Sequence, residues 1–216
     1  MPGTCNFSSP AVRISLCCNK QGAHSMLRTL KHSLSLLFLL GFSLNARAAG
    51  TQAATFAAGC FWGSEEMFRK IPGVIETQVG YTGGAKKASY EEVSNGGTGH
   101  AESVEVKFDP SKVTYEQLLN TFFKMHDPTT PNRQGNDQGS QYRSEIFVHS
   151  EAQKKAALAF KEKVEKSGTW KAPIVTKIEA AGAFYPAEDY HQKYLVKHPG
   201  GYDNHFLRNY NFDAKK

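Results

Sequence analysis

Cysteine is scarce in this 216-residue chain, and three of its four cysteines lie within the first 18 residues. Cys60 is the only cysteine that follows them, so residues 49–216 can form no internal disulfide bond. The same scarcity excludes a Cys-x-x-Cys redox motif or an all-cysteine metal site from that part of the chain.

Acidic residues are absent from positions 1–48, which hold five of the 26 lysines and arginines. Without these five, 21 basic side chains face 20 acidic ones, so the +6 charge of the whole chain falls to +1. No basic stripe interleaved with aromatic residues remains, and this argues against nucleic-acid binding.

Long apolar runs are also missing, apart from one in the acid-free segment. Met26 opens a short basic stretch, residues 34–44 are mostly apolar, and Ala46-Arg47-Ala48 matches a small-residue cleavage site. This order of regions is typical of a secretory signal peptide, and the apolar run is too short to span a bilayer. We therefore expect a leader over residues 1–48, a true start at Met26, and a mature domain over residues 49–216 that is periplasmic or secreted, with no membrane attachment. An organellar transit peptide is the alternative, because the leader is rich in serine.

Cys60 lies between a strand pattern and a helix pattern. Residues 53–58 are apolar, Gly59 interrupts them, and residues 61–71 have helical periodicity that ends at Pro72. In that helix Glu65 with Arg69, and Glu66 with Lys70, are spaced as i,i+4 ion pairs. Free N–H groups at a helix start favour a thiolate and lower the pKa of a cysteine, so Cys60 is a candidate reactive thiol. The alternative is a small buried apolar side chain, as most free cysteines are.

Residues 100–109 alternate in the manner of a strand. Glu102 shares its predicted face with Val104, Val106 and Phe108, which are apolar. A carboxyl group in apolar surroundings has a raised pKa and is a candidate general acid. The alternative is a strand-end residue whose side chain reaches solvent.

The remaining pattern predicts one domain without internal repeats. We expect strands over 74–81, 145–149 and 174–180, and helices over 115–126, 150–168 and around 189–196, with a long polar loop over 128–141. With the segments above, this order predicts an α+β two-layer sandwich with a ferredoxin-like split βαβ core and a mixed sheet.

Six short motifs occur in order between Thr55 and Tyr202. They are Gly59-Cys60-Phe61-Trp62-Gly63, Gly80-Tyr81-Thr82-Gly83-Gly84, Gly99-His100-Ala101-Glu102, Phe108-Asp109-Pro110, Gly135-Asn136-Asp137-Gln138-Gly139-Ser140-Gln141-Tyr142-Arg143-Ser144 and Ala187-Glu188-Asp189-Tyr190-His191-Gln192. Together they resemble the motifs of the peptide methionine sulfoxide reductase A family. The resemblance implies a thiol-dependent oxidoreductase that returns the S epimer of methionine sulfoxide, in proteins and free, to methionine.

The resemblance also implies a role for each matching residue. Cys60 would be the nucleophile that attacks the sulfoxide sulfur and becomes a sulfenic acid, and Glu102 would protonate the sulfoxide oxygen. The other implied roles belong to Tyr90 and Tyr142, which hydrogen-bond that oxygen, to Phe61 and Trp62, which wall the S-methyl group, and to Asp137, which orients the site.

The C-terminal part departs from much of the family. Many members carry a resolving cysteine near a Gly-Tyr pair, whereas this chain has Gly201-Tyr202-Asp203 and no cysteine after Cys60. The resemblance therefore implies a one-cysteine enzyme without metal or other cofactor. Its sulfenic acid would be reduced by an external thiol such as a thioredoxin-like protein, glutaredoxin or glutathione. We expect a monomer.

Two other functions compete with this interpretation. A cysteine hydrolase needs a histidine base, and six histidines are available: His100, His126, His149, His191, His198 and His205. A metal or binding module could use the last three, which recur every seven residues. Because Pro199 interrupts any helix that would align them, we expect surface histidines instead.

Overall fold

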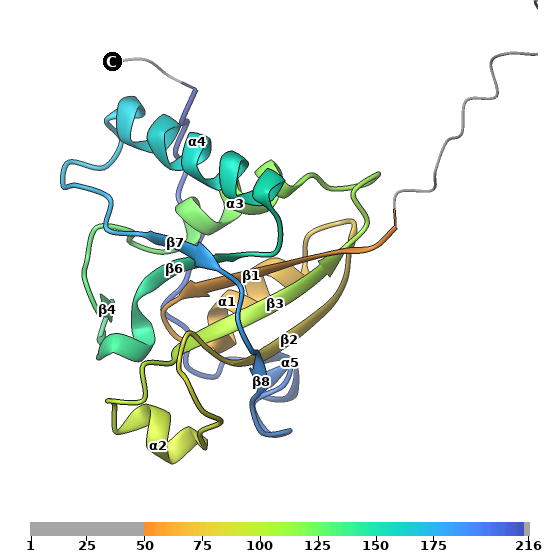
Figure 1. Ribbon diagram of the computed structural model, residues 1–216, viewed down its shortest axis with the longest axis vertical. Helices are drawn as coiled ribbons and strands as arrows, with labels where there is room; N and C mark the ends of the chain where they lie inside the picture. The colour runs from red at the N-terminus through yellow and green to blue at the C-terminus, as the bar shows by residue number, and fades with distance from the viewer. Residues whose placement is uncertain (1–49, 214–216) are drawn as a thin grey trace, which may run out of the picture. The chain divides into compact units, whose positions relative to one another are not determined.

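The structure is a computed structural model that describes residues 50–213 (Figure 1). The predicted leader and its cleavage site lie outside the described residues. Along the chain the elements are β1 (Gln52–Ala58), α1 (Phe61–Arg69), β2 (Val74–Thr82), α2 (Tyr90–Ser94), β3 (Ala101–Phe108), α3 (Tyr115–Met125), β4 (Arg133–Gln134), β5 (Asp137–Gln138), the 3-10 turn η1 (Ser140–Tyr142), β6 (Ser144–Val148), α4 (Glu151–Ser167), β7 (Lys177–Ala180), β8 (Tyr185–Pro186) and α5 (Tyr194–Lys197).

The main sheet has the strand order β7-β6-β1-β3-β2-β8. Strand β3 runs antiparallel between β1 and β2, so β1, α1 and β2 form a split βαβ unit (Figure 1). With α3 and β6 the order within the core is that of a ferredoxin-like fold, and the parallel pairing of β6 with β7 makes the sheet mixed. The predicted fold class is confirmed.

Aromatic side chains attach the helices to one face of the sheet. Phe56 of β1 stacks on Phe68 of α1 with ring centroids 4.8 Å apart, and its ring lies 5.4 Å from Phe122 of α3. Helix α4 joins this layer because Phe160 stacks on Phe123 at 5.9 Å. Burying each such ring contributes about 2–3 kcal/mol, so this layer forms most of the core.

Three predicted segments differ in extent from the structure. The last predicted strand is shorter, because only residues 177–180 pair with β6. The helix expected around 189–196 is the single turn α5, which begins after Lys193 at φ 55°. The long polar loop over 128–141 contains the small β4–β5 hairpin and the start of η1.

One of the two ion pairs predicted for α1, that of Glu65 with Arg69, does not form. Glu66 pairs with both Arg69 and Lys70, whereas Glu65 turns inward and is 1% exposed. Its carboxylate accepts hydrogen bonds from Thr77 Oγ1 at 3.0 Å and from the backbone N–H and Nζ of Lys193, both at 2.7 Å. Glu65 thus fastens the segment after β8 to α1 and β2.

Among residues 50–213, no helix combines the length and the apolar content that crossing a bilayer would need.

Candidate active site

The seven residues to which the family resemblance assigned a role meet at one small cavity of about 160 Å³. They come from the start of α1, the start of α2, the second residue of β3, the β4–β5 hairpin and the end of η1. The lining residues are Cys60, Phe61, Trp62, Tyr90, Glu102, Asp137, Tyr142 and Tyr202. Because β1 and β3 pair antiparallel, the C-terminal end of β1 and the N-terminal end of β3 lie at the same end of the sheet, which brings Cys60 near Glu102.

Cys60 is the N-cap residue of α1 and is 8% exposed. Burial raises the pKa of its thiol well above the ordinary value, and the nearby carboxyls of Glu102 and Asp137 raise it further. The backbone N–H groups of Trp62 and Gly63 act to lower the pKa of the thiol, as expected at a helix start. The effect of burial is larger, so the pKa stays raised. The prediction of a lowered pKa is therefore wrong for this structure, because the sequence pattern placed the helix start but not the depth of burial.

Glu102 lies beside the thiol on the apolar face of β3 and is 2% exposed. Burial raises the pKa of its carboxyl to about 8. The hydrogen bond from the Phe61 N–H acts to lower that pKa, and the nearby charge of Asp137 acts to raise it. The Phe61 N–H donates to Glu102 Oε2 at 3.0 Å, so the carboxyl is held at the start of α1. The expected buried carboxyl is confirmed, and the solvent-reaching alternative is excluded.

Phe61 and Trp62 form an aromatic wall of the cavity, and Trp62 is supported from two sides. Its indole stacks on Tyr194 with ring centroids 3.7 Å apart and an interplanar angle of 11°. Its Nε1 donates to His191 Nδ1 at 3.0 Å. This arrangement gives the wall a fixed orientation before any ligand binds.

Tyr90 and Tyr142 contribute two phenol groups to the cavity. The Tyr90 backbone N–H donates to Glu188 Oε1 at 3.1 Å, and Tyr81 Oη donates to the other oxygen of the same carboxylate at 3.1 Å. Burial and the nearby carboxyls raise the pKa of Tyr142, so at neutral pH its hydroxyl keeps its proton and can donate a hydrogen bond.

Asp137 receives hydrogen bonds from two residues near the C-terminus that no predicted element had placed beside it. Tyr202 Oη donates to its Oδ1 at 2.9 Å, and Asn204 Nδ2 donates to its Oδ2 at 2.8 Å. Burial and the bond to Asp137 raise the pKa of Tyr202 to about 12. The Gly201-Tyr202 pair was the one signal in the sequence that pointed to this segment.

The histidines are arranged differently from the expectation. His191 and His205 are 1% and 5% exposed, so the prediction of surface positions is wrong for both, while His198 is exposed. Within the described residues, no group of three or more histidine, cysteine, aspartate or glutamate side chains is placed to hold a metal ion. Since none of the residues lining the Cys60 cavity is a histidine, the hydrolase alternative has no base beside the thiol.

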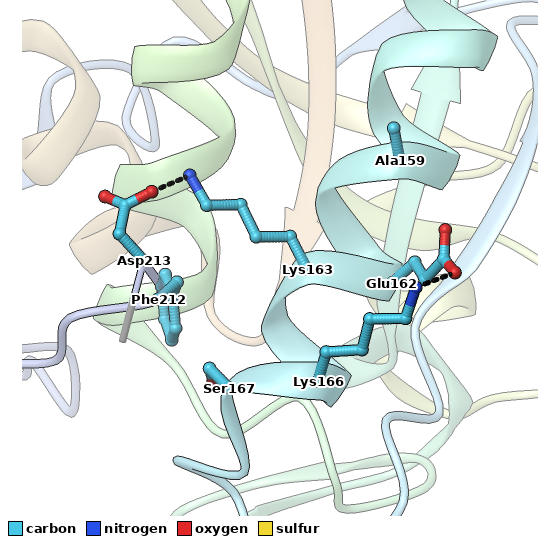
Figure 2. A pocket seen from close by; sticks show the side chains of 7 residues that line it. All are labelled: Ala159, Glu162, Lys163, Lys166, Ser167, Phe212 and Asp213. Atoms are coloured by element: carbon cyan, nitrogen blue, oxygen red, sulfur yellow. Dashed lines mark ion pairs between the residues drawn. The ribbon is translucent and has the colours of Figure 1, made fainter. Parts of the chain in front are cut away.

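Two larger hollows on the described surface do not carry comparable chemistry. Figure 2 shows one of about 340 Å³ between α4 and the C-terminal segment. Its charged side chains pair with one another, Lys163 with Asp213 and Lys166 with Glu162. A second hollow, of about 430 Å³, lies between the start of β1 and the start of α4, and it contains no thiol or carboxylate. We therefore assign the candidate active site to the smaller cavity at Cys60.

Comparisons with known proteins point to one family for the chain as a whole. The profile of the family described as peptide methionine sulfoxide reductase matches residues 52–215. A relative from Methanosarcina acetivorans, named peptide methionine sulfoxide reductase MsrA, is 57% identical over 162 residues, which cover 74% of this chain and 85% of that protein.

Two solved structures of Mxr1 from Saccharomyces cerevisiae have the same fold. The reduced form is 42% identical, with a TM-score of 0.71, and the match covers 74% of this chain and 94% of that one. Mxr1 in complex with Trx2 is 31% identical, with a TM-score of 0.51 and coverage of 74% and 92%. A buried thiol, a protonated carboxyl and paired phenols in one aromatic cavity define a cysteine-dependent oxidoreductase site. The chain belongs to the peptide methionine sulfoxide reductase family.

Proposed function

We propose that this chain reduces the S epimer of methionine sulfoxide, in proteins and free, to methionine, with Cys60 as the nucleophile. The observation that carries the proposal is the cavity itself, which joins the thiol, the raised-pKa carboxyl of Glu102, two phenols and an aromatic wall. Its volume of about 160 Å³ suits a thioether-sized group rather than a large ligand.

Each residue has a role that follows from its chemistry. Glu102 gives its proton to the sulfoxide oxygen, which leaves poorly until it is protonated, and the hydroxyls of Tyr90 and Tyr142 hold that oxygen. Phe61 and Trp62 enclose the S-methyl group, and Asp137 orients the site. These assignments rest on the lining of the cavity and on burial, which raises the pKa of the Glu102 carboxyl.

The proposed reaction balances without a cofactor. The Cys60 sulfur attacks the sulfoxide sulfur and forms an S–S bond with it. The protonated oxygen then leaves the substrate sulfur for the Cys60 sulfur as the S–S bond breaks, which yields a sulfenic acid on Cys60 and free methionine. The substrate sulfur gains two electrons and the cysteine sulfur loses two. The proton of the thiol replaces the one that Glu102 donated, so the reactive form carries both protons.

Turnover assays with separate epimers test this function. Wild-type protein with dithiothreitol should reduce methionine S-sulfoxide and leave the R epimer largely unchanged, because the wall and the phenols fix one orientation at sulfur. The Cys60→Ser variant should have no measurable activity. Equal turnover by wild type and variant would refute the proposal.

We also propose that an external thiol reduces the sulfenic acid, since the mature chain holds no second cysteine. The complex of the yeast relative with Trx2 supports a thioredoxin-like reductant, and glutaredoxin or glutathione are the alternatives. After one turnover without reductant, mass spectrometry of the monomeric mature protein should find Cys60 oxidised and no intramolecular disulfide. An intramolecular disulfide would contradict the one-cysteine assignment.

The sequence pattern of residues 26–48 supports the proposal that the protein is exported to the periplasm or beyond, with residues 49–216 as the catalytic domain. N-terminal sequencing of the protein recovered from an exporting cell should give Ala49 as the first residue. A start at Met26 in the recovered protein would oppose export with cleavage at this site.

A further inference from the structure

The segment Asp203–His205 lies directly behind the turn that carries Cys60. His205 is 5% exposed, and its Nε2 lies 2.8 Å from the carbonyl oxygen of Ala58 and 3.2 Å from Ser64 Oγ. It does not line the cavity at the thiol, so it has no direct access to a bound sulfoxide. Any influence on the reaction must therefore pass through the backbone of the turn.

The donors and acceptors around the imidazole define a single chain of contacts. A carbonyl oxygen only accepts, so the Nε2 atom of His205 carries a proton and donates to Ala58. The Ser64 hydroxyl donates to the carbonyl oxygen of Cys60 at 3.1 Å, and its oxygen faces the same Nε2. The His205 side chain thus bonds the carbonyl of Ala58 directly. It reaches the carbonyl of Cys60 indirectly, through the hydroxyl of Ser64.

The turn requires such support for two reasons. Gly59 has a φ of 95°, a conformation that favours glycine, which is also the most mobile residue in an unrestrained chain. The first helical bond, from the Ser64 N–H to the Cys60 carbonyl, is long at 3.4 Å, so the hydroxyl of Ser64 supplies a stronger bond to the same oxygen. The pairing of Ala58 with Ser144 and the bond from the Phe61 N–H to Glu102 hold the ends of the turn through the sheet, and the link to His205 adds a tie to the C-terminal segment.

Asp203 holds the backbone at His205 and lies beside its imidazole. Its Oδ1 accepts from the backbone N–H of His205 at 2.8 Å and lies 3.5 Å from His205 Nδ1. Although burial acts to raise the pKa of Asp203, its contacts with His205 and the charge of Lys70 hold that pKa below the ordinary value. A Cβ atom at Gly63 would lie 2.1 Å from Asp203 Oδ1, so this carboxylate packs tightly against the first turn of α1.

We infer that His205, held by Asp203 and acting through Ser64, is a positioning residue that sets the location of the Cys60 sulfur for attack. The inference rests on the proposed function in one respect, that Cys60 is the attacking atom. A displacement of about 1 Å at a reacting atom can lower a rate on the order of a hundredfold, so loosening the turn has a measurable cost. The positioning role of His205 also gives the segment after Gly201-Tyr202 a function that requires no cysteine.

Single-turnover kinetics test the inference with His205→Ala, His205→Gln and Ser64→Ala. At saturating methionine S-sulfoxide, we expect the rate of methionine release by His205→Ala to fall about tenfold to a hundredfold. His205→Gln, which keeps one N–H donor, should recover part of that rate, and Ser64→Ala should lose several-fold. The Michaelis constant should change less than the rate in all three.

Gln153→Ala is the matched control. Gln153 is also a buried polar side chain that bonds a β1 carbonyl from a distant segment, with its Nε2 2.7 Å from the oxygen of Ala53. It lies at the opposite end of the strand from Cys60, so its loss should lower the urea midpoint while leaving the single-turnover rate within twofold of wild type. A His205→Ala variant that loses stability but keeps the wild-type rate would overturn the inference.

A second measurement needs no sulfoxide and therefore separates this inference from the proposed function. Iodoacetamide should alkylate Cys60 several-fold faster in His205→Ala than in wild type, because a loosened turn exposes the thiol, and Gln153→Ala should match wild type. Failure of wild type to reduce any sulfoxide would refute the proposed function while leaving this comparison valid. If His205→Ala does not fold, wild-type alkylation and turnover rates in both His205→Gln and Ser64→Ala would overturn the positioning role.

Discussion

The backbone N–H of Phe61 donates to Glu102 Oε2 at 3.0 Å, joining two residues 41 positions apart in the chain. The bond holds the carboxyl at the start of α1, directly beside Cys60. One N–H group does not offset the burial of the carboxyl, and its pKa is raised to about 8. Glu102 therefore holds a proton at neutral pH in a place where a helix start would otherwise favour a carboxylate.

The pH dependence of the reaction should follow the Glu102 proton. Because the reactive form carries that proton, kcat/KM for methionine S-sulfoxide should fall as pH rises through about 8, approaching tenfold per pH unit above it. Glu102→Gln should lower kcat/KM by about 10²- to 10³-fold and abolish this decline. Rates measured from pH 6 to 10 with fixed dithiothreitol thiolate concentration provide the check.

Tyr185→Phe is a suitable control for that profile, since Tyr185 on β8 is absent from the cavity lining. It should keep both the rate and the decline above pH 8. A wild-type profile that rises through pH 8 would contradict the assignment of Glu102 as the proton donor.

Glu102 should also make folding stability depend on pH. Its pKa is about 8 in the folded state and near the ordinary glutamate value when unfolded, so between these values the folded state binds more protons. The free energy of unfolding should therefore decrease as pH rises from about 4.5 to 8, by on the order of a few kcal/mol. Urea unfolding at pH 5 and pH 8 should show Glu102→Gln more stable than wild type at pH 8, with a smaller difference at pH 5. An equal difference at both pH values would mean that this carboxyl is ionised in the folded protein.

Trp62 should govern substrate affinity. Trp62→Ala removes an aromatic wall held by Tyr194 and His191, so KM for methionine S-sulfoxide should rise about tenfold, the equivalent of losing roughly 1.4 kcal/mol of apolar contact. In Trp62→Phe the KM should rise less, because the phenylalanine ring can still stack on Tyr194. Trp170→Ala is the control, because Trp170 packs edge-on against Tyr210, away from the cavity, and its KM should stay at the wild-type value. A normal KM in Trp62→Ala would remove this residue from the binding site.

Lys193 should be important for stability. Lys193→Met removes the partner of Glu65, which is 1% exposed, and leaves a carboxylate with too few donors in the interior. We expect a loss of about 2–4 kcal/mol in the free energy of unfolding, measured by urea titration. Lys107→Met breaks an ion pair with Glu76 in which both side chains are about half exposed, and it should cost less than about 1 kcal/mol. Equal losses in the two variants would show that the Glu65 contact is not a buried ion pair in solution.

The core of the fold could be predicted because its signals are local. Apolar runs, alternation and capping residues place β1, β3 and α3 close to their observed bounds, and the side chain of Thr114 caps α3. The tail could not be predicted in the same way. Residues 187–193 are held by side-chain contacts to α1 and β2, such as those of Lys193, and such contacts leave no periodic trace in the sequence.

For the site, the sequence by itself determined two candidate reacting groups, one cysteine at a strand-to-helix turn and one carboxyl on an apolar strand face, and the family resemblance supplied their proposed roles. Tertiary structure alone decided their protonation. The depth of burial, set by helices and a C-terminal segment from far along the chain, raises the pKa of both Cys60 and Glu102. It also decided which residues hold the turn, because His205 meets Ser64 only when the chain returns 141 residues later. Spacing along a sequence shows which chemical groups are present, whereas the pKa of each group depends on what the folded chain packs around it.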